Sequence, residues 1–251
     1  MKNCLLIFSI LLSSICASAQ KLTVIPKIGT TLATVLVEEP DFQNLPILGD
    51  QDANSVKPIF GITIGAALNY SINDMISVQP ELNFIQKGYQ EKFYSSMIEI
   101  IDDKSFNTHI TSTSKYKMNY LEIPILARYT FGTTIKPYAI AGPSLGIGLG
   151  GKYKFEEKIV ESIDDDPAQT STDNGKGNIK FGKEPDNNDS EDLYIDNRID
   201  FGLQLGAGVL IDRKFVIEAR YGLGLSSLYD SEYKIKNRVF QLTVGIPILL
   251  K

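Results

Sequence analysis

Apolar and polar residues alternate over several long segments of this chain. In residues 239–251 the apolar side chains share one parity, at Phe240, Leu242, Val244, Ile246, Ile248 and Leu250. Gln241, Thr243 and Gly245 occupy the other parity. Successive side chains of a strand point to opposite faces of its sheet, so this segment predicts a strand with one apolar and one polar face. Transmembrane β-barrels use such strands, with the apolar face toward lipid and the polar face toward the lumen.

The same alternation recurs along the chain and predicts eight strands. They cover residues 21–35, 59–70, 75–91, 114–131, 137–155, 195–211, 215–228 and 239–251. Short turns follow the second, fourth and sixth strands, and longer connections follow the other strands. Outer-membrane barrels have this layout, with short turns in the periplasm and long loops outside. We therefore predict an all-β fold, an eight-stranded antiparallel up-and-down transmembrane β-barrel with short periplasmic turns and long extracellular loops. A bulge is expected near Gly142 and Pro143, where the parity is unclear.

The first 19 residues have the pattern of a secretory signal peptide. Lys2 supplies the positive charge, residues 5–12 form a short apolar core, and Ala17-Ser18-Ala19 is a cleavage site. The apolar run is shorter than the roughly 20 residues that span a bilayer. We therefore expect residues 1–19 to be removed and residues 20–251 to form a single barrel domain. Both cysteines, Cys4 and Cys16, lie in the signal, so the mature chain has no disulfide and no thiolate metal site.

The formal net charge of −5 and the pI of about 5.1 argue against nucleic acid as a partner. The longest predicted loop, residues 156–196, is strongly acidic. Its clustered carboxylates are Asp164, Asp165, Asp166, Asp186, Asp189, Glu191 and Asp192. Clustered oxygen ligands can bind calcium weakly, but the EF-hand spacing is absent. A solvated extracellular loop is the preferred interpretation.

Several charged residues fall on the polar faces of the predicted strands. They are Glu81, Glu122, Arg128, Glu218 and Arg220. A basic residue facing lipid at mid-membrane costs about 2–4 kcal/mol, so these side chains are expected to point into the lumen. Small eight-stranded barrels have interiors filled by side chains, which predicts a Glu/Arg network that closes the lumen. The alternative interpretations are a proton or ion path and a carboxylate pair for acid–base catalysis.

Aromatic residues lie beside the predicted short turns. They are Tyr70, Tyr129, Phe131, Tyr138 and Phe215. Because aromatic side chains are enriched where a barrel meets the membrane–water interface, these residues predict the periplasmic aromatic girdle.

Several runs of the sequence resemble one family. Residues 120–129 read YLEIPILARY, residues 141–145 read AGPSL, and Lys136-Pro137-Tyr138, Pro26-Lys27-Ile28-Gly29 and residues 78–82, VQPEL, accompany them. These runs are similar to those of the PorT-like outer-membrane β-barrel proteins of Bacteroidota, over nearly the whole mature chain. The resemblance implies an eight-stranded outer-membrane barrel and no particular activity. Many barrel proteins end in an aromatic residue, whereas this chain ends in Leu250-Lys251.

These observations favour a non-enzymatic outer-membrane barrel that displays its extracellular loops. The expected partners are outer-membrane lipid, the barrel-assembly machinery and an extracellular or envelope protein, without a cofactor or a metal. One alternative is a narrow channel or transporter for small solutes, and another is a soluble periplasmic lipocalin-like lipid binder with the apolar faces inside. An enzyme is the least supported, because a hydrolase needs a polar nucleophile with a partner base and the single histidine, His109, lies in a predicted loop.

Overall fold

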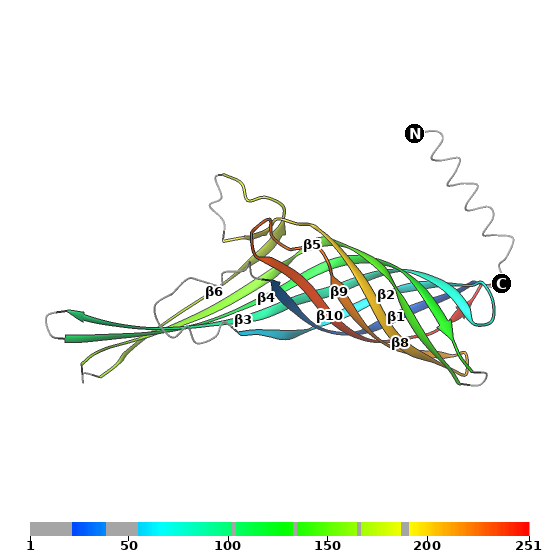
Figure 1. The fold of residues 1–251 in the computed structure, drawn as a ribbon, viewed down its shortest axis with the longest axis horizontal. Coiled ribbons are helices and arrows are strands. Elements are labelled where there is room, and N and C mark those ends of the chain that lie inside the picture. Colours follow the sequence, from blue (N-terminus) through cyan, green and yellow to red (C-terminus); the bar gives the residue numbers. More distant parts are fainter. Residues whose placement is uncertain are drawn as a thin grey trace.

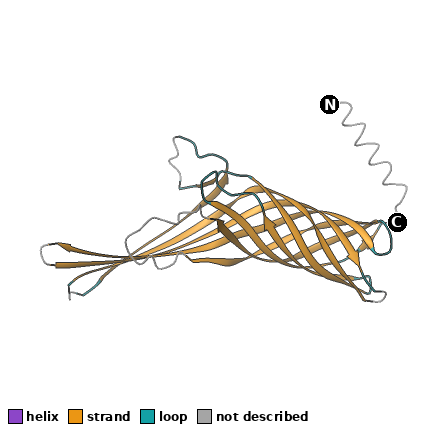
Figure 2. Ribbon diagram, in the orientation of Figure 1, coloured by secondary structure: helices purple, strands orange, loops and turns teal. Residues whose placement is uncertain are grey.

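The computed structural model describes residues 22–38, 55–101, 104–132, 135–164, 167–186 and 191–250. The predicted signal peptide lies outside these residues. All regular elements of the described chain are strands, as Figure 2 shows. The described residues include no helix long and apolar enough to cross a membrane.

Eight strands form the barrel (Figure 1). They are β1 (Leu22–Glu38), β2 (Ser55–Ser71), β3 (Ile76–Ile101), β4 (Lys104–Thr130), β5 (Ile135–Ile163), β8 (Ile199–Ile211), β9 (Phe215–Gly224) and β10 (Lys234–Gly245). Each strand pairs antiparallel with the next one in this order. The ring closes where β1 pairs antiparallel with β10, with Thr31 opposite Gln241. The predicted eight-stranded up-and-down barrel is confirmed.

Three further strands add to this ring. β6 (Gln169–Phe181) runs antiparallel to the outer part of β5, and β7 (Leu193–Ile195) pairs parallel with the end of β6. β11 (Ile248–Leu249) pairs with the start of β1. The first and last described strands therefore meet at the end of the barrel that carries the short turns.

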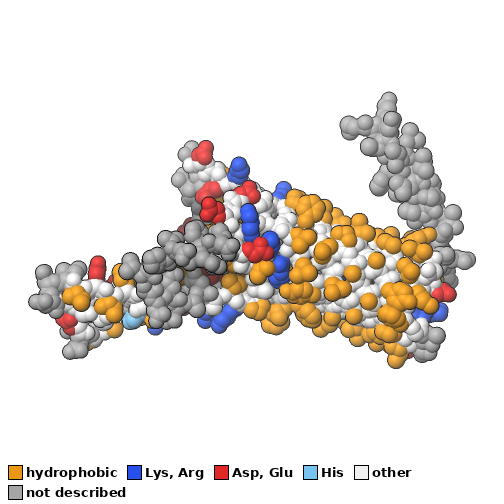
Figure 3. All heavy atoms as spheres, viewed as in Figure 1, with side chains coloured by type: hydrophobic (Ala, Val, Ile, Leu, Met, Phe, Trp, Pro, Cys, Tyr) orange, Lys and Arg blue, Asp and Glu red, His pale blue; other side chains and the backbone are white. Residues whose placement is uncertain are grey.

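The outer surface of the barrel is an apolar band, which Figure 3 shows around the part nearest the short turns. Alternate residues of each strand point outward, and large apolar side chains such as Phe60, Leu205 and Phe240 are exposed there. The other parity is buried and mixed, with Gln79 and Glu218 among the inward polar side chains and Ile85 and Ile140 among the inward apolar ones. This is the arrangement of a lipid-facing barrel. The lipocalin-like alternative, which placed the apolar faces inside, is therefore wrong.

A bulge interrupts the pairing of β4 with β5, although not at the predicted place. Gly142 and Pro143 lie in a regular stretch of β5, whereas the register shifts where Asn119 lies opposite Gly150 and Tyr120 lies opposite Gly148. The extra residue is Leu149. Gly150 has a φ of 135°, which is accessible to glycine and strained for other residues, so the bulge forms where glycine permits it.

Two long hairpins project beyond the apolar band at the end opposite the short turns (Figure 1). We call this projection the blade; it consists of residues 93–101, 104–113, 154–163 and 169–177. Pairing continues from Lys92 opposite Thr113 to the tip of the β3–β4 hairpin, and β4 stays paired with β5 as far as Phe106 opposite Ile163. The predicted loops 92–113 and 156–196 are therefore wrong in large part, because much of both segments is strand.

The physical reason for this error lies in the environment of the blade. Both of its faces meet solvent, so its strands need no alternation of apolar and polar residues. Residues 108–114 read THITSTS, which is rich in β-branched residues and shows no apolar face. The alternation of apolar and polar residues therefore cannot be used to predict the strands in this part of the sheet.

Candidate functional site

The barrel interior holds buried charges of both signs. Among the described residues, four carboxylates and four basic side chains are at most 6% exposed and belong to barrel strands. The carboxylates are Glu81, Glu122, Asp200 and Glu218, and the basic residues are Lys27, Lys87, Arg128 and Arg220. Each lies on the inward parity of its strand, because the opposite parity forms the apolar band. Burying this many charges requires that they be paired.

A central cluster joins three strands across the lumen. Lys27 Nζ lies 2.6 Å from Glu81 Oε1 and 3.3 Å from Glu218 Oε1. Arg220 Nη2 and Nη1 lie 2.6 and 2.9 Å from the two oxygens of Glu81, and Arg220 Nε donates to Glu218 Oε1 at 2.6 Å. Two cations and two carboxylates thus form a neutral cluster. Tyr138 completes it by donating its hydroxyl proton to Glu218 Oε2 at 2.7 Å.

A second cluster lies nearer the blade. Lys87 Nζ lies 2.7 Å from Glu122 Oε1 and 3.0 Å from Asp200 Oδ2. Asn237 donates to the same oxygen of Asp200 at 2.9 Å. Gln204 donates to Glu122 at 2.8 Å and accepts from Arg220 at 3.0 Å, so it connects this cluster to the central one. With two carboxylates and one cation, the second cluster carries one excess negative charge.

Arg128 lies toward the short turns and forms no ion pair with the carboxylates of either cluster. Its Nε donates to Thr130 Oγ1 at 3.3 Å, and its Nη1 lies 3.4 Å from Gln79 Oε1. The guanidinium also lies over the ring of Tyr138, 3.6 Å from the centroid. Among the described residues, no carboxylate forms an ion pair with Arg128, and no other buried cation of the lumen shares this property.

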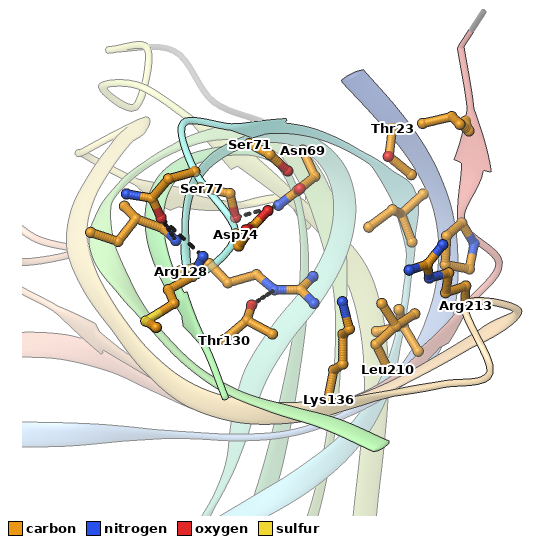
Figure 4. A pocket seen from close by; sticks show the side chains of 17 residues that line it. Thr23, Asn69, Ser71, Asp74, Ser77, Arg128, Thr130, Lys136, Leu210 and Arg213 are labelled. Atoms are coloured by element: carbon orange, nitrogen blue, oxygen red, sulfur yellow. Dashed lines mark hydrogen bonds between the residues drawn. The ribbon is translucent and has the colours of Figure 1, made fainter. Parts of the chain in front are cut away.

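These side chains leave little free space between them. Two cavities beside the clusters measure about 10 Å³ each, which is roughly the space that one water molecule needs. One of them adjoins Asp200 and Asn237, each of which has an oxygen without a hydrogen-bond partner among the described residues. A larger cavity of about 500 Å³ lies at the short-turn end of the barrel, and Figure 4 shows the side chains around it.

The structure places all five predicted lumen charges inside the barrel. Four of them, Glu81, Glu122, Glu218 and Arg220, join the two clusters, and Arg128 stays outside both. Sequence reasoning missed Lys27, Lys87 and Asp200. Lys87 and Asp200 share the parity of the inward residues on predicted strands, so parity alone could have found them. The inward position of Lys27 was harder to predict, because Pro26 interrupts the alternation of apolar and polar residues beside it.

The five predicted girdle residues do not share one environment. Tyr70, Tyr129, Phe131 and Phe215 are exposed on the outside near the short turns. Tyr138 is only 2% exposed and points into the lumen, so its assignment to the girdle is wrong. The outward parity of β5 at this end belongs to Pro137 and Ala139, and the hydroxyl of Tyr138 is satisfied by Glu218.

The predicted acidic cation loop is dispersed over several elements. Asp164 lies at the tip of the β5–β6 hairpin and accepts from the backbone N–H of Ser105 at 2.7 Å. Asp192 lies 2.6 Å from Lys180 Nζ, which raises the pKa of that lysine. Asp186 and Glu191 are described, whereas Asp165, Asp166 and Asp189 lie outside the described residues. The described part of the chain contains no group of three or more His, Cys, Asp or Glu side chains that could hold a metal ion.

Comparison with known proteins agrees with this architecture. A family model described as "Outer membrane protein beta-barrel domain" matches residues 19–230. No curated protein matches the chain. The similar solved structures include the attachment invasion locus protein Ail of Yersinia pestis, with 14% identity over 91% of this chain and 99% of Ail and a TM-score of 0.40.

Two other similar structures are a surface protein and a β-barrel domain. Neisserial surface protein A has 14% identity over 91% of this chain and 97% of its own, with a TM-score of 0.32. The N-terminal β-barrel domain of Pseudomonas aeruginosa OprF has 12% identity over 91% and 98%, with a TM-score of 0.29. The family model covers most of the chain, and the chain therefore belongs to the outer membrane protein beta-barrel domain family and lies in the bacterial outer membrane.

Proposed function

We propose that this chain is a PorT-like barrel of Bacteroidota whose lumen is closed and whose blade binds an extracellular protein. The observation that carries the proposal is the blade itself, a sheet that extends well beyond the apolar band (Figure 1). Long extensions of this kind are not needed to span a membrane, for which strands of about 9–11 residues suffice. β3 has 26 residues and β4 has 27, so their outer halves have another role.

The blade offers two features that favour a protein partner. Within the described chain, residues 93–101 of β3 pair only with β4, because the pairing of β2 with β3 ends where Ser55 lies opposite Lys92. An open strand edge can accept an extended segment of another protein. Ile98 and Ile100, on one face beside this edge, are 65% and 76% exposed. Contiguous exposed apolar surface marks interaction sites, and these two isoleucines are neighbours on one face of the strand.

The closed lumen supports an interaction role over transport. The two charge clusters occupy the interior, and the cavities beside them hold about 10 Å³ each. We infer that the ionic network holds the barrel wall together and that the protein acts through its surface. No catalytic role is assigned, because lysine and arginine hold the buried carboxylates in ion pairs.

Site-specific photocrosslinking in living cells tests the proposal. A photoreactive amino acid replaces Ile98, and the matched control replaces Phe201, an exposed apolar residue of β8 in the lipid-facing band. We expect a discrete protein adduct from position 98 and none from position 201. Heat-modifiable migration on a gel confirms that both variants form barrels. The absence of an adduct at position 98, or the same adduct at both positions, would contradict a blade-bound partner.

A further inference from the structure

The cavity at the short-turn end has a marked charge bias. Three basic residues line it, Arg128, Lys136 and Arg213, against one carboxylate among the described lining residues, Asp74. Figure 4 shows these side chains around the opening between the ends of the strands. None of the four forms an ion pair within the described chain. The lining therefore has more positive than negative charges, and none of these four side chains is joined in a described ion pair.

Arg128 is the strongest single indication of a ligand. It is 6% exposed, and its described contacts are the hydroxyl of Thr130, the amide oxygen of Gln79 and the ring of Tyr138. The other buried cations of the lumen each contact two carboxylates. Glu218 attracts Arg128 across the lumen, but it is already held by Lys27, Arg220 and Tyr138. A buried guanidinium without a carboxylate of its own is costly, and an anion in the adjoining cavity would relieve that cost.

Arg213 reaches the cavity from a strained turn. Asp212 and Arg213 have φ values of 48° and 56°, and Lys214 closes the turn by donating its N–H to the carbonyl of Ile211 at 2.9 Å. Left-handed backbone at residues other than glycine is unfavourable, and asparagine or glycine would suit this turn better. The sequence nevertheless has arginine here, at a position whose side chain lines the cavity.

The remaining walls determine what kind of anion would fit. The cavity is also lined by apolar residues, among them Ile25, Leu210, Val216 and Leu249. Asn69, Ser71 and Ser77 add uncharged polar groups. Its volume of about 500 Å³ lies in the range of small-ligand sites, which combine apolar walls with a few polar groups that fix orientation.

We propose that this cavity is a periplasmic binding site for a small organic carboxylate with an apolar body, such as the C-terminal end of a peptide. The planar guanidinium of Arg128 accepts a carboxylate in a two-point geometry, and Lys136 and Arg213 add positive potential at the mouth. The apolar walls contact the body of the ligand. The site lies at the opposite end of the barrel from the blade and does not depend on blade binding.

A titration of the purified, detergent-solubilised barrel tests this site. The probe is acetyl-Ala-Ala-Leu with a free C-terminal carboxylate, its control is the same peptide as the C-terminal amide, and inorganic phosphate is the third ligand. Calorimetry measures the affinity for each. We expect binding of the free acid, and at least about tenfold weaker binding of the amide, because a charge-assisted hydrogen-bonded pair is lost.

Two neighbouring residues of one turn provide matched variants. Arg213→Asn removes a charge that lines the cavity and suits the left-handed backbone, whereas Lys214→Asn removes a charge of the same turn that does not line it. We expect about threefold weaker binding in R213N and unchanged binding in K214N. Arg128→Gln should weaken binding about tenfold, with barrel formation checked by heat-modifiability.

Each other outcome overturns the proposal. Equal affinity for the acid and the amide would exclude a carboxylate site. Binding of phosphate without the peptide would assign the cavity to a different anion class. Equal weakening of binding by R213N and K214N would mean that the peptide responds to the overall charge of the turn and does not contact Arg213 in the cavity. The absence of binding to every ligand would exclude a site for this class.

Discussion

At the scale of single residues, the central cluster depends on charge balance. Lys27 and Arg220 together neutralise Glu81 and Glu218, whose side chains are fully buried. Lys27→Met would leave two carboxylates facing one guanidinium. Removal of one partner from a buried ion pair typically costs about 3–5 kcal/mol, so we expect a loss of this size in the free energy of unfolding. Urea unfolding in lipid vesicles, followed by the heat-modifiable gel shift, measures it.

A second substitution separates charge balance from lost packing. Glu218→Gln in the Lys27→Met background restores a neutral pair between Arg220 and Glu81 and keeps an acceptor for Tyr138. We expect the double variant to be more stable than Lys27→Met alone, with a coupling of about 1–3 kcal/mol. Additive losses in the two single variants would show that the lysine contributes through its packing.

Residue parity accounts for what the sequence could predict of this site. Glu81, Glu218 and Arg220 were assigned to the lumen because charge cannot face lipid cheaply. The assignment of Tyr138 to the girdle is wrong because an aromatic side chain can face either the lipid or the lumen. Its residue type therefore does not indicate which of the two it faces. The pairing of Lys27 with Glu218 joins residues 191 positions apart, and nothing in a local pattern predicts such a contact.

At the scale of elements, the blade is the part that the sequence analysis predicted wrongly. Barrel strands can be recognised in the sequence because the face toward lipid must be apolar. This requirement ends where the strands leave the membrane. The register of the β3–β4 hairpin places Ser96 opposite His109 and Ser112 opposite Phe93. The expected mature chain has no cysteine, so engineered pairs report this register without interference.

We expect Ser96→Cys with His109→Cys to form a disulfide on mild oxidation, because directly opposed strand residues lie within bridging distance. Ser96→Cys with Ser112→Cys is the control, since its positions are three residues out of register and on opposite faces. Mobility on a non-reducing gel distinguishes the two. Equal crosslinking of both pairs would indicate a mobile loop in place of a paired hairpin.

At the scale of the whole molecule, the filled lumen predicts that the barrel does not conduct. An eight-stranded barrel has an interior just wide enough for side chains to fill, and here ionic clusters and small cavities occupy it. We expect no steady conductance from the purified protein in a planar bilayer. The large periplasmic cavity does not alter this expectation, because the central cluster lies between it and the extracellular end.

Removal of half of the central cluster should change this behaviour. Glu81→Ala with Arg220→Ala deletes a carboxylate and a guanidinium that contact each other across the lumen, and it leaves Lys27 paired with Glu218. The net charge is unchanged, so an effect on current reflects the opened space. We expect small ionic currents in this variant, provided that its gel shift shows a folded barrel. Conductance in the unmodified protein, equal to that of the variant, would mean that water passes the clusters and that the channel interpretation is correct.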